Sequence, residues 1–249
     1  MIPRFYAPHA TVPGAVVSLS DDEAGHLMQV LRLGAGAAVA VFDGRGREFE
    51  ACVEAAGKSG VTVRLGAPRT SAPEAAVAVT LAQAVLKGDK MDDVVRDAVM
   101  MGVAAIQPVV TTRSEISLGT IDRGHRRERW ERIAIASAKQ CGRAVVPEIL
   151  APREFSAVID ALKHHALPGP GLMFVEPSVA TEAVGIIDLE LPPPRETTVM
   201  IGPEGGWSRQ EIEDASGLCR MVTLGKRTLR ADAMPIVALA ALFTVWRQF

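Results

Sequence analysis

The sequence predicts an α/β protein with a parallel sheet in its larger C-terminal part and a separate β-rich domain in its first 70 residues. Strand and helix patterns alternate from residue 75 onward, which is typical of parallel strands joined by crossover helices. A segment rich in Pro, Ser and Thr at residues 68–73 marks the boundary. With 249 residues, 48% of them hydrophobic, the chain is long enough for two folded domains. We therefore expect domains at residues 1–70 and 71–249.

The N-terminal part contains one predicted helix and one predicted hairpin. Ser20 and Glu23 have the spacing of a capping box, which predicts a helix start. The apolar stripe of this helix consists of Leu27, Val30 and Leu31. The hairpin combines strands at residues 39–42 and 48–53 around the glycine-bearing turn 43–46.

The C-terminal part begins with a predicted strand at residues 77–81. A helix follows Asp89 and stops at Gly102. Its apolar side, which we expect in the core, consists of Met91, Val94, Val95, Ala98 and Met101. Residues 123–143 are the most basic region. On a helix, Arg132, Lys139 and Arg143 lie opposite Trp130, Ile133, Ala134 and Cys141, which favours either a solvated surface or a positive contact face.

Two glycine-bearing loops follow short apolar strands near the C-terminus. The first, residues 201–207, follows a strand at 197–201 and precedes a helix with a capping box that begins at Ser208. The second, residues 224–230, follows a strand at 221–224. Ligands of α/β sheets bind outside the carboxyl ends of strands, so we expect the loops to share a small-molecule pocket. The alternative is a pair of ordinary strand-to-helix turns.

The acidic residue of the first loop constrains the ligand. Glu204 would repel nucleotide phosphates, and neither loop has the dinucleotide fingerprint or the GKS/GKT phosphate loop. Residues 52–59 end like a phosphate loop, but Cys52 occupies the place of its first glycine. An acidic loop with exposed carbonyls suits a cationic ligand such as the sulfonium of S-adenosylmethionine.

The last predicted helix, residues 233–246, is apolar on nearly every side. Asp232 is expected to cap it, and Pro235 falls in its first turn. Such a helix is buried inside a domain or between subunits, and this one is too short to cross a bilayer. Three separated cysteines indicate a reducing compartment and no metal site. The first residues lack a signal-peptide pattern, so we expect a cytoplasmic protein.

The net charge of −2 does not by itself indicate a nucleic-acid partner. Any attraction to phosphates must come from local clusters of basic residues.

The two loops resemble the cofactor loops of the SPOUT class of knotted RNA methyltransferases. The matching residues are Gly202-Pro203-Glu204-Gly205-Gly206, Leu224-Gly225 and Leu229-Arg230. Further matches, which resemble the RsmE family, are Arg4-Phe5, His26 with Val30-Leu31-Arg32, Lys87-Gly88-Asp89-Lys90-Met91, residues 102–114, Trp130, Lys139-Gln140-Cys141 and Arg143. That family methylates N3 of a uridine in small-subunit ribosomal RNA. The chain departs from the family at Ala231-Asp232-Ala233-Met234, where a threonine, a glutamate and another small residue are frequent.

The resemblance implies a trefoil knot in residues 71–249, a PUA-like RNA-binding barrel in residues 1–70 and a homodimer. It implies S-adenosylmethionine as cofactor, bound by Glu176, Gly202, Pro203, Glu204, Gly205, Gly206, Leu224, Gly225, Leu229 and Arg230. The RNA contacts that we expect are Arg4, His26, Arg32, Lys87, Lys90, Arg113, Lys139, Gln140 and Arg143.

Two residues are candidates for the chemistry. Arg230 is our choice to stabilise the charge that develops on the uracil oxygens, because its guanidinium is permanently charged. The alternative is a scaffold role for Arg230, paired with Glu204 or Asp232. Glu204 is the acidic candidate nearest the sulfonium, although organising its loop is the favoured role.

Because N3 lies on the pairing edge of the base, the target must be unpaired or extruded. We therefore expect structured RNA or an assembled small ribosomal subunit as the substrate. The other functions that the sequence leaves open are a non-catalytic RNA-binding module whose pocket has lost its ligand, and a dehydrogenase or kinase that uses a nucleotide.

Overall fold

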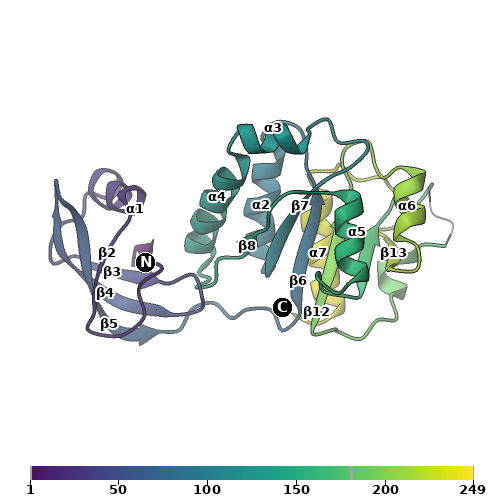
Figure 1. Cartoon of the computed structure of the whole chain (residues 1–249). Helices are drawn as coiled ribbons and strands as arrows, with labels where there is room; N and C mark the ends of the chain where they lie inside the picture. The colour runs from purple at the N-terminus through teal and green to yellow at the C-terminus, as the bar shows by residue number, and fades with distance from the viewer. Residues whose placement is uncertain (1, 180–181, 249) are drawn as a thin grey trace. The chain divides into compact units, whose positions relative to one another are not determined.

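A computed structural model describes residues 2–179 and 182–248, and the chain divides into two compact units (Figure 1). The first unit comprises Met1–Glu74 and Ile135–Val146, and the second comprises Ala75–Ala134 and Pro147–Phe249. The predicted N-terminal domain, residues 1–70, did not include residues 135–146. That segment is the C-terminal half of a helix and the residues after it.

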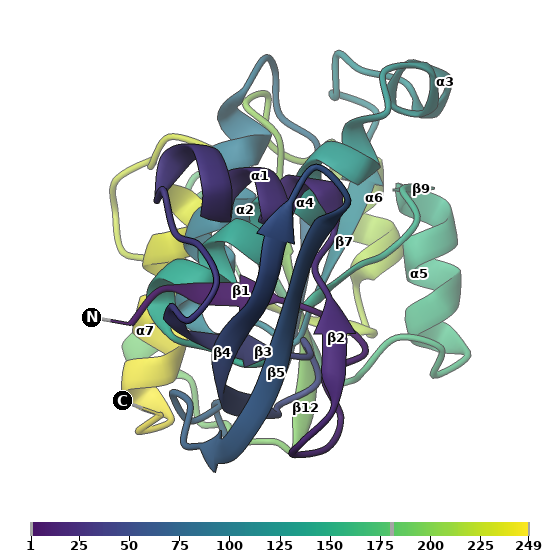
Figure 2. The same ribbon diagram turned by 90° about the vertical axis from the view of Figure 1, so that its left-hand side faces the viewer.

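The first unit is built on a five-stranded sheet with the order β1-β3-β4-β5-β2 (Figure 2). Its strands are β1 (Arg4–Tyr6), β2 (Val16–Ser18), β3 (Ala38–Phe42), β4 (Glu48–Gly57) and β5 (Gly60–Arg69). β1 is parallel to β3, and the other pairs are antiparallel. The β3-β4 hairpin confirms the sequence prediction. β5 extends to Arg69, so the predicted linker at 68–73 begins inside a strand.

The predicted N-terminal helix is interrupted after one and a half turns. α1 (Asp21–Gly25) starts where the Ser20 side chain accepts the Glu23 N–H, and it continues into the π-helix η1 (His26–Val30). Leu27 is fully buried, but Val30 is 66% exposed. The predicted burial of Val30 and of Leu31 was therefore wrong, because the wider π turn shifts residues away from the 3.6-residue stripe.

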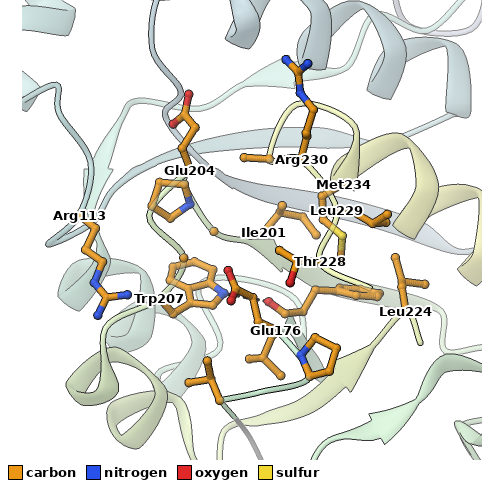
Figure 3. Close-up of a pocket in the computed structure, with 18 of the residues that line it drawn as sticks. Arg113, Glu176, Ile201, Glu204, Trp207, Leu224, Thr228, Leu229, Arg230 and Met234 are labelled. Carbon is orange, nitrogen blue, oxygen red and sulfur yellow. Dashed lines mark hydrogen bonds between the residues drawn. The ribbon is translucent and has the colours of Figure 1, made fainter. Parts of the chain in front are cut away.

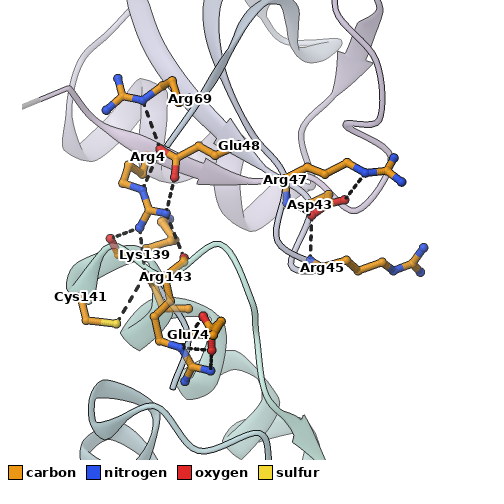
Figure 4. A network of polar contacts seen from close by, with 11 residues as sticks. Arg4, Asp43, Arg45, Arg47, Glu48, Arg69, Glu74, Lys139, Cys141 and Arg143 are labelled. Carbon is orange, nitrogen blue, oxygen red and sulfur yellow. Dashed lines mark hydrogen bonds and ion pairs between the residues drawn. The ribbon is translucent and has the colours of Figure 1, made fainter. Parts of the chain in front are cut away.

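Arg4 joins β1 to the end of α4 (Arg126–Cys141) within the first unit (Figure 4). Its guanidinium donates to the Glu48 carboxylate at 2.8 Å, to the carbonyls of Ala138 and Lys139 at 2.9 and 2.8 Å, and to the Arg143 carbonyl at 2.9 Å. The side chains of Arg4 and Glu48 are 11% and 3% exposed. Carbonyls at a helix C-terminus lack partners within the helix, so Arg4 caps α4.

Two other predicted RNA contacts also lie in this network. The Lys139 ammonium binds the Glu23 carboxylate at 2.8 Å, and the buried Arg143 guanidinium binds Glu74. The RNA contacts of Arg4, Lys139 and Arg143 stay predictions, and an RNA phosphate would compete with these partners. Their charges are already paired inside the first unit, and moving Arg4 or Lys139 away would take a cation from a buried carboxylate, Glu48 or Glu23.

We predict that Arg4→Met destabilises the first unit by about 2 kcal/mol, since it removes a charged donor from three carbonyls and from buried Glu48, which keeps its longer contact to Arg69 at 3.4 Å. Hydrogen exchange of the β3 and β4 amides measures this loss as faster opening. Arg64→Met is the control, because Arg64 pairs with Glu54 at the surface and such pairs contribute about 0–1 kcal/mol. Equal exchange in both variants would contradict the structural role of Arg4.

The second unit is a parallel sheet with the order β11-β13-β10-β12-β6-β7-β8, and β9 pairs with β7. Its strands are β6 (Ala78–Ala84), β7 (Ala105–Val110), β8 (Glu148–Ile149), β9 (Arg153–Glu154), β10 (Gly171–Phe174), β11 (Val184–Gly185), β12 (Glu196–Ile201) and β13 (Cys219–Thr223). The three strands predicted to start at residues 77, 197 and 221 are confirmed, and each starts within two residues of its predicted position. β10 lies between β12 and β13, although it precedes both along the chain.

Helices connect these strands and cover the sheet. They are α2 (Lys90–Met101), α3 (Leu118–Arg123), α4, α5 (Phe155–Lys163), the 3₁₀ helix η2 (Ile186–Asp188), α6 (Arg209–Ala215) and α7 (Met234–Val245). α2 contacts α7, and α5 contacts α6. The predicted core side of α2 is buried except for half-buried Met101, and Gly102 ends the helix with a φ of 98°.

The last helix, α7, differs from its prediction at its start and on one face. Asp232 does not cap it, because the Asp232 carboxylate binds Arg230 instead. Val237 and Val245 are 40% and 39% exposed, so this chain alone does not bury the helix on every side. No helix among residues 2–179 and 182–248 combines the length and apolar character needed to span a bilayer.

Candidate functional site

A cavity of about 390 Å³ lies at the carboxyl ends of β10, β12 and β13 (Figure 3). The loop after β12 and the loop after β13 both contribute walls, so the prediction that the two glycine loops share one cavity is confirmed. The two loops follow β12 and β13, which are both parallel to β10 and pair with it on opposite sides. The loops therefore lie at the same edge of the sheet, although they are apart in the sequence. This is the edge at which α/β sheets bind ligands.

Most of the residues expected to hold the cofactor line this cavity. They are Glu176, Gly202, Pro203, Glu204, Gly206, Leu224, Leu229 and Arg230. Gly205 and Gly225 do not line it. The Gly205 carbonyl accepts a hydrogen bond from Arg113 at 2.8 Å, and Gly225, with φ of 85°, allows the turn after β13. These two glycines shape the loops without facing the cavity.

A third wall, the loop after β10, was not part of the two-loop prediction. Of this loop, only Glu176 was expected at the site, whereas Phe174, Val175, Pro177 and Val179 also line the cavity. The Trp207 indole N–H donates to the Phe174 carbonyl at 2.9 Å, which ties this loop to the first glycine loop. The sequence contains one sign of this wall, the short apolar strand 171–174 ahead of Glu176-Pro177. An apolar stretch of this length does not distinguish a strand that leads into a binding loop from other short segments.

Glu176 places a carboxylate beside the apolar walls of the cavity. Figure 3 shows it next to Trp207 and Thr228. A Cβ atom added at Gly206 would lie 3.1 Å from the Glu176 Oε1, and Gly206 has a φ of 67°. Residue 206 must therefore be a glycine for two reasons: its backbone has a positive φ, and a side chain would collide with the Glu176 carboxylate. A half-buried carboxylate in such a cavity suits a ligand with cationic or hydrogen-bond donor groups.

Glu204 ties the first glycine loop to the start of α2. Its carboxylate accepts from the Lys90 ammonium at 2.9 Å and from the Lys87 N–H at 3.3 Å. Burial acts to raise the pKa of Glu204, but these hydrogen bonds outweigh it and hold the pKa below its ordinary value. An ionised carboxylate with a lowered pKa is a weak proton acceptor, so the geometry favours loop organisation over a base role.

Arg230 lies at the cavity edge and pairs with a residue two positions away. Its guanidinium donates to both oxygens of Asp232, at 3.1 and 2.8 Å, and this contact lowers the pKa of Asp232. Of the two scaffold partners considered, Asp232 is the one observed. The Arg230 side chain is 76% exposed, so it can exchange this partner for a substrate group without leaving a buried charge behind.

Two further predicted RNA contacts lie around the same edge. Lys90 and Arg113 line the cavity. Lys87 does not, and its ammonium pairs with exposed Glu115, whose hydrogen bond raises the pKa of Lys87. The structure therefore brings Lys90, Arg113 and Arg230 together at the cavity, each with an exposed or half-buried cationic side chain.

Buried Glu211 fastens the first glycine loop to the loop after β7. One carboxylate oxygen accepts the Ser208 N–H at 2.8 Å, and the other accepts the Thr112 N–H at 2.8 Å. The Ser208 hydroxyl in turn accepts the Glu211 N–H, which confirms the predicted capping box. The bond from Arg113 to Gly205 is a second tie between the same two loops.

We predict that Glu211→Gln weakens S-adenosylmethionine binding about tenfold. A glutamine amide can satisfy only one of the two N–H groups, and an unpaired buried donor costs about 1–3 kcal/mol. Calorimetric titration measures the change. Glu213→Gln, on the exposed side of α6, is the matched control and should bind as the unmodified protein does. Unchanged affinity in Glu211→Gln would show that this tie does not hold the loop.

Comparison with known proteins agrees with this architecture. The RNA methyltransferase domain family matches residues 73–243, and the RNA methyltransferase PUA domain family matches residues 19–66. The chain is 31% identical over 228 residues to ribosomal RNA small subunit methyltransferase E of Synechocystis sp., which covers 91% of this chain and 72% of that protein. The chain belongs to this methyltransferase family.

Solved structures of family relatives agree over the whole chain. A methyltransferase of Legionella pneumophila in complex with SAM is 30% identical, with 98% of each chain covered and a TM-score of 0.88. Ribosomal RNA small subunit methyltransferase E of Neisseria gonorrhoeae, bound to S-adenosyl methionine, is 32% identical, with 99% of this chain and 98% of that chain covered and a TM-score of 0.86. Family membership thus extends over both units.

Proposed function

We propose that this protein transfers the methyl group of S-adenosylmethionine to N3 of a uridine in small-subunit ribosomal RNA. The observation that carries the proposal is the single cavity formed by three loops at the carboxyl end of the sheet, with Glu176 inside it and Arg230 at its edge. Two solved relatives bind S-adenosylmethionine, and family membership supports the same donor here. Bound there, S-adenosylmethionine supplies an electrophilic methyl group.

The residues of the cavity fit that cofactor. Phe174, Leu224 and Leu229 supply apolar surface, and Gly202 and Gly206 let the backbone approach a ligand closely. Glu176 offers a carboxylate to its cationic or hydroxyl groups. Glu176 disfavours a phosphate beside it, although Lys90, Arg113 and Arg230 also line the cavity. The match to the RNA methyltransferase domain family counts against the dehydrogenase or kinase alternative.

The RNA base would approach from the edge that carries Arg230. As the N3 proton leaves, negative charge spreads to the uracil carbonyl oxygens, and the Arg230 guanidinium stabilises it once released from Asp232. Lys90 and Arg113 hold nearby phosphates or the base. Glu204 keeps the loop in place, and we assign no residue as the proton acceptor.

The finer points of architecture are also part of the proposal. We infer a trefoil knot in residues 71–249 from membership of the methyltransferase family. We infer a closed PUA-like barrel in residues 1–70. The first unit would contact RNA through the predicted residues, which are His26, Arg32 and Gln140 together with Arg4, Lys139 and Arg143, and the last three also bind carboxylates of the unit. Arg32 and Gln140 are exposed, and His26 is half-buried.

We also infer a homodimer through the second unit, supported by exposed Val237 and Val245 on the otherwise buried α7. An assembled small subunit is the proposed substrate, and a cytoplasmic protein would meet it there. Light scattering of the purified protein tests the dimer, and a monomer at micromolar concentration would contradict it.

Methylation of small subunits that lack the modification tests the proposed activity. Purified protein is incubated with labelled S-adenosylmethionine and the subunits, and the RNA is digested to nucleosides. We expect label in 3-methyluridine. Label in another nucleoside would overturn the N3 assignment, and cofactor binding without any label would favour the non-catalytic RNA-binding alternative.

A further inference from the structure

The turn between β3 and β4 carries two arginines that the predicted site did not include. Residues 43–47 read Asp-Gly-Arg-Gly-Arg, and the side chains of Arg45 and Arg47 are exposed (Figure 4). Among the described residues, no acidic side chain lies within ion-pair distance of the Arg45 guanidinium. The Arg47 guanidinium is 3.9 Å from the Asp43 carboxylate and remains 59% exposed.

This turn is held in one conformation from inside. Asp43 is buried, with 2% of its surface exposed. Its carboxylate accepts hydrogen bonds from the N–H groups of Arg45 and Arg47 at 2.7 and 3.0 Å. The Asp43 N–H also donates to the Arg47 carbonyl at 3.0 Å. Asp43 therefore directs its short hydrogen bonds to the backbone. The Arg45 guanidinium faces solvent, and the Arg47 guanidinium keeps longer contacts, to the Asp43 carboxylate at 3.9 Å and to the Thr11 carbonyl at 3.4 Å.

Neighbouring segments of the first unit support the turn from two sides. The Gly46 N–H donates to the Ala144 carbonyl at 3.1 Å, and the Val146 N–H donates to the Gly44 carbonyl at 3.0 Å. Tyr6 lies below the turn, since a Cβ atom added at Gly44 would come within 2.7 Å of the Tyr6 ring. Gly44 and Gly46 have φ values of 78° and 104°, which other residues rarely adopt.

Most other cations of this unit have acidic partners. Arg4 and Arg69 bind Glu48, Lys139 binds Glu23, and Arg143 binds Glu74. Paired cations attract phosphates weakly, because a carboxylate partner cancels their field. Exposed arginines on a rigid turn lose little conformational freedom on binding and present planar donors that match phosphate oxygens.

We propose that the 43–47 turn is a phosphate-contact site for RNA, in which Arg45 and Arg47 each bind one backbone phosphate. The site adds to the predicted RNA contacts of this unit, among which Arg4 already binds Glu48 and three carbonyls. The inference rests on the proposed function, because it assigns the RNA-binding role of the first unit to particular side chains. Tyr6 and Asp43 act as supports for the turn and do not bind the ligand.

The test compares RNA binding by the full chain and by Arg45→Ala/Arg47→Ala. Filter binding to in vitro transcribed small-subunit RNA is measured over a salt series. Two lost phosphate contacts should reduce the slope of log Kd against log salt by about 1.4 and weaken binding about 25-fold at 0.1 M salt. Arg45→Lys/Arg47→Lys keeps both charges and should retain most of the affinity.

A charge-matched variant distinguishes a local site from the effect of net charge. Arg64→Ala/Arg96→Ala removes two exposed arginines that already pair with carboxylates, and it should change Kd less than threefold. S-adenosylmethionine titration confirms that the second unit of each variant is folded, and hydrogen exchange of the β3 and β4 amides confirms it for the first unit. If both double variants lose the same affinity, or if neither does, the turn is not the contact site.

An error in the proposed function and an error in the assignment of the turn would give different results. If the unmodified protein neither binds nor methylates the RNA, the methyltransferase assignment is wrong together with this inference. If it methylates small subunits and Arg45→Ala/Arg47→Ala binds RNA with unchanged Kd and salt slope, only the assignment of the turn is wrong.

Discussion

Arg230→Ala should bind S-adenosylmethionine with the affinity of the unmodified protein and lose methyl transfer by about 10²–10³-fold. The loss follows from removing a charged donor aimed at developing negative charge, which is typically worth that factor in rate. Cofactor binding should survive, because the exposed guanidinium binds Asp232 at the cavity edge and does not support the loop from inside. Single-turnover methylation of small subunits and calorimetry measure the two quantities separately.

Two variants make this result specific. Arg230→Lys keeps the charge without the planar fork and should recover part of the rate. Asp232→Asn frees Arg230 from its ionised partner and should leave turnover within about tenfold of the unmodified rate, since Asp232 is not assigned to the chemistry. Full activity of Arg230→Ala would remove Arg230 from the mechanism and leave it as a surface ion pair.

Gly206→Val should abolish measurable S-adenosylmethionine binding, which means a loss of at least about 100-fold in affinity. The added side chain would meet the Glu176 carboxylate, since even a Cβ atom would be 3.1 Å from it. The backbone φ of 67° adds strain of about 1–2 kcal/mol for a residue with a side chain. Calorimetric titration of the full chain measures the loss.

Gly217→Val is the matched control, because Gly217 has a φ of 81° but no atom within 4 Å of an added Cβ, and it lies outside the cavity. It carries the same kind of backbone strain without blocking the site, and should bind cofactor normally. Gly205→Val should have a smaller effect than Gly206→Val, since an added Cβ there meets only the flexible Arg113 side chain. Normal binding by Gly206→Val would place the cofactor elsewhere.

The sequence predicted those features that depend on local patterns. The capping box at Ser208, the C-terminal Gly102 of α2 and the β3-β4 hairpin are set by neighbouring residues, and all were confirmed. The shared cavity could also be predicted, because parallel strands place their carboxyl ends at one edge of the sheet. Periodicity and turn chemistry therefore located the site to within two loops.

The features that sequence analysis missed depend on contacts between distant residues. Arg4 binds carbonyls 134 to 139 positions away, and no local pattern reveals that a basic motif residue is a helix cap. Glu211 was predicted as a capping residue, but its second bond, to Thr112, required the structure. Asp232 was expected to cap α7, but in the structure its carboxylate accepts hydrogen bonds from Arg230.

A crystal structure of the protein grown with S-adenosylmethionine is the most direct test of the central claim. We predict electron density for the cofactor between residues 202–207 and 224–230, with Glu176 within hydrogen-bonding distance of it and the methyl group facing the Arg230 edge. Cofactor density at any other place, or a cavity that stays empty at saturating cofactor concentration, would contradict the account.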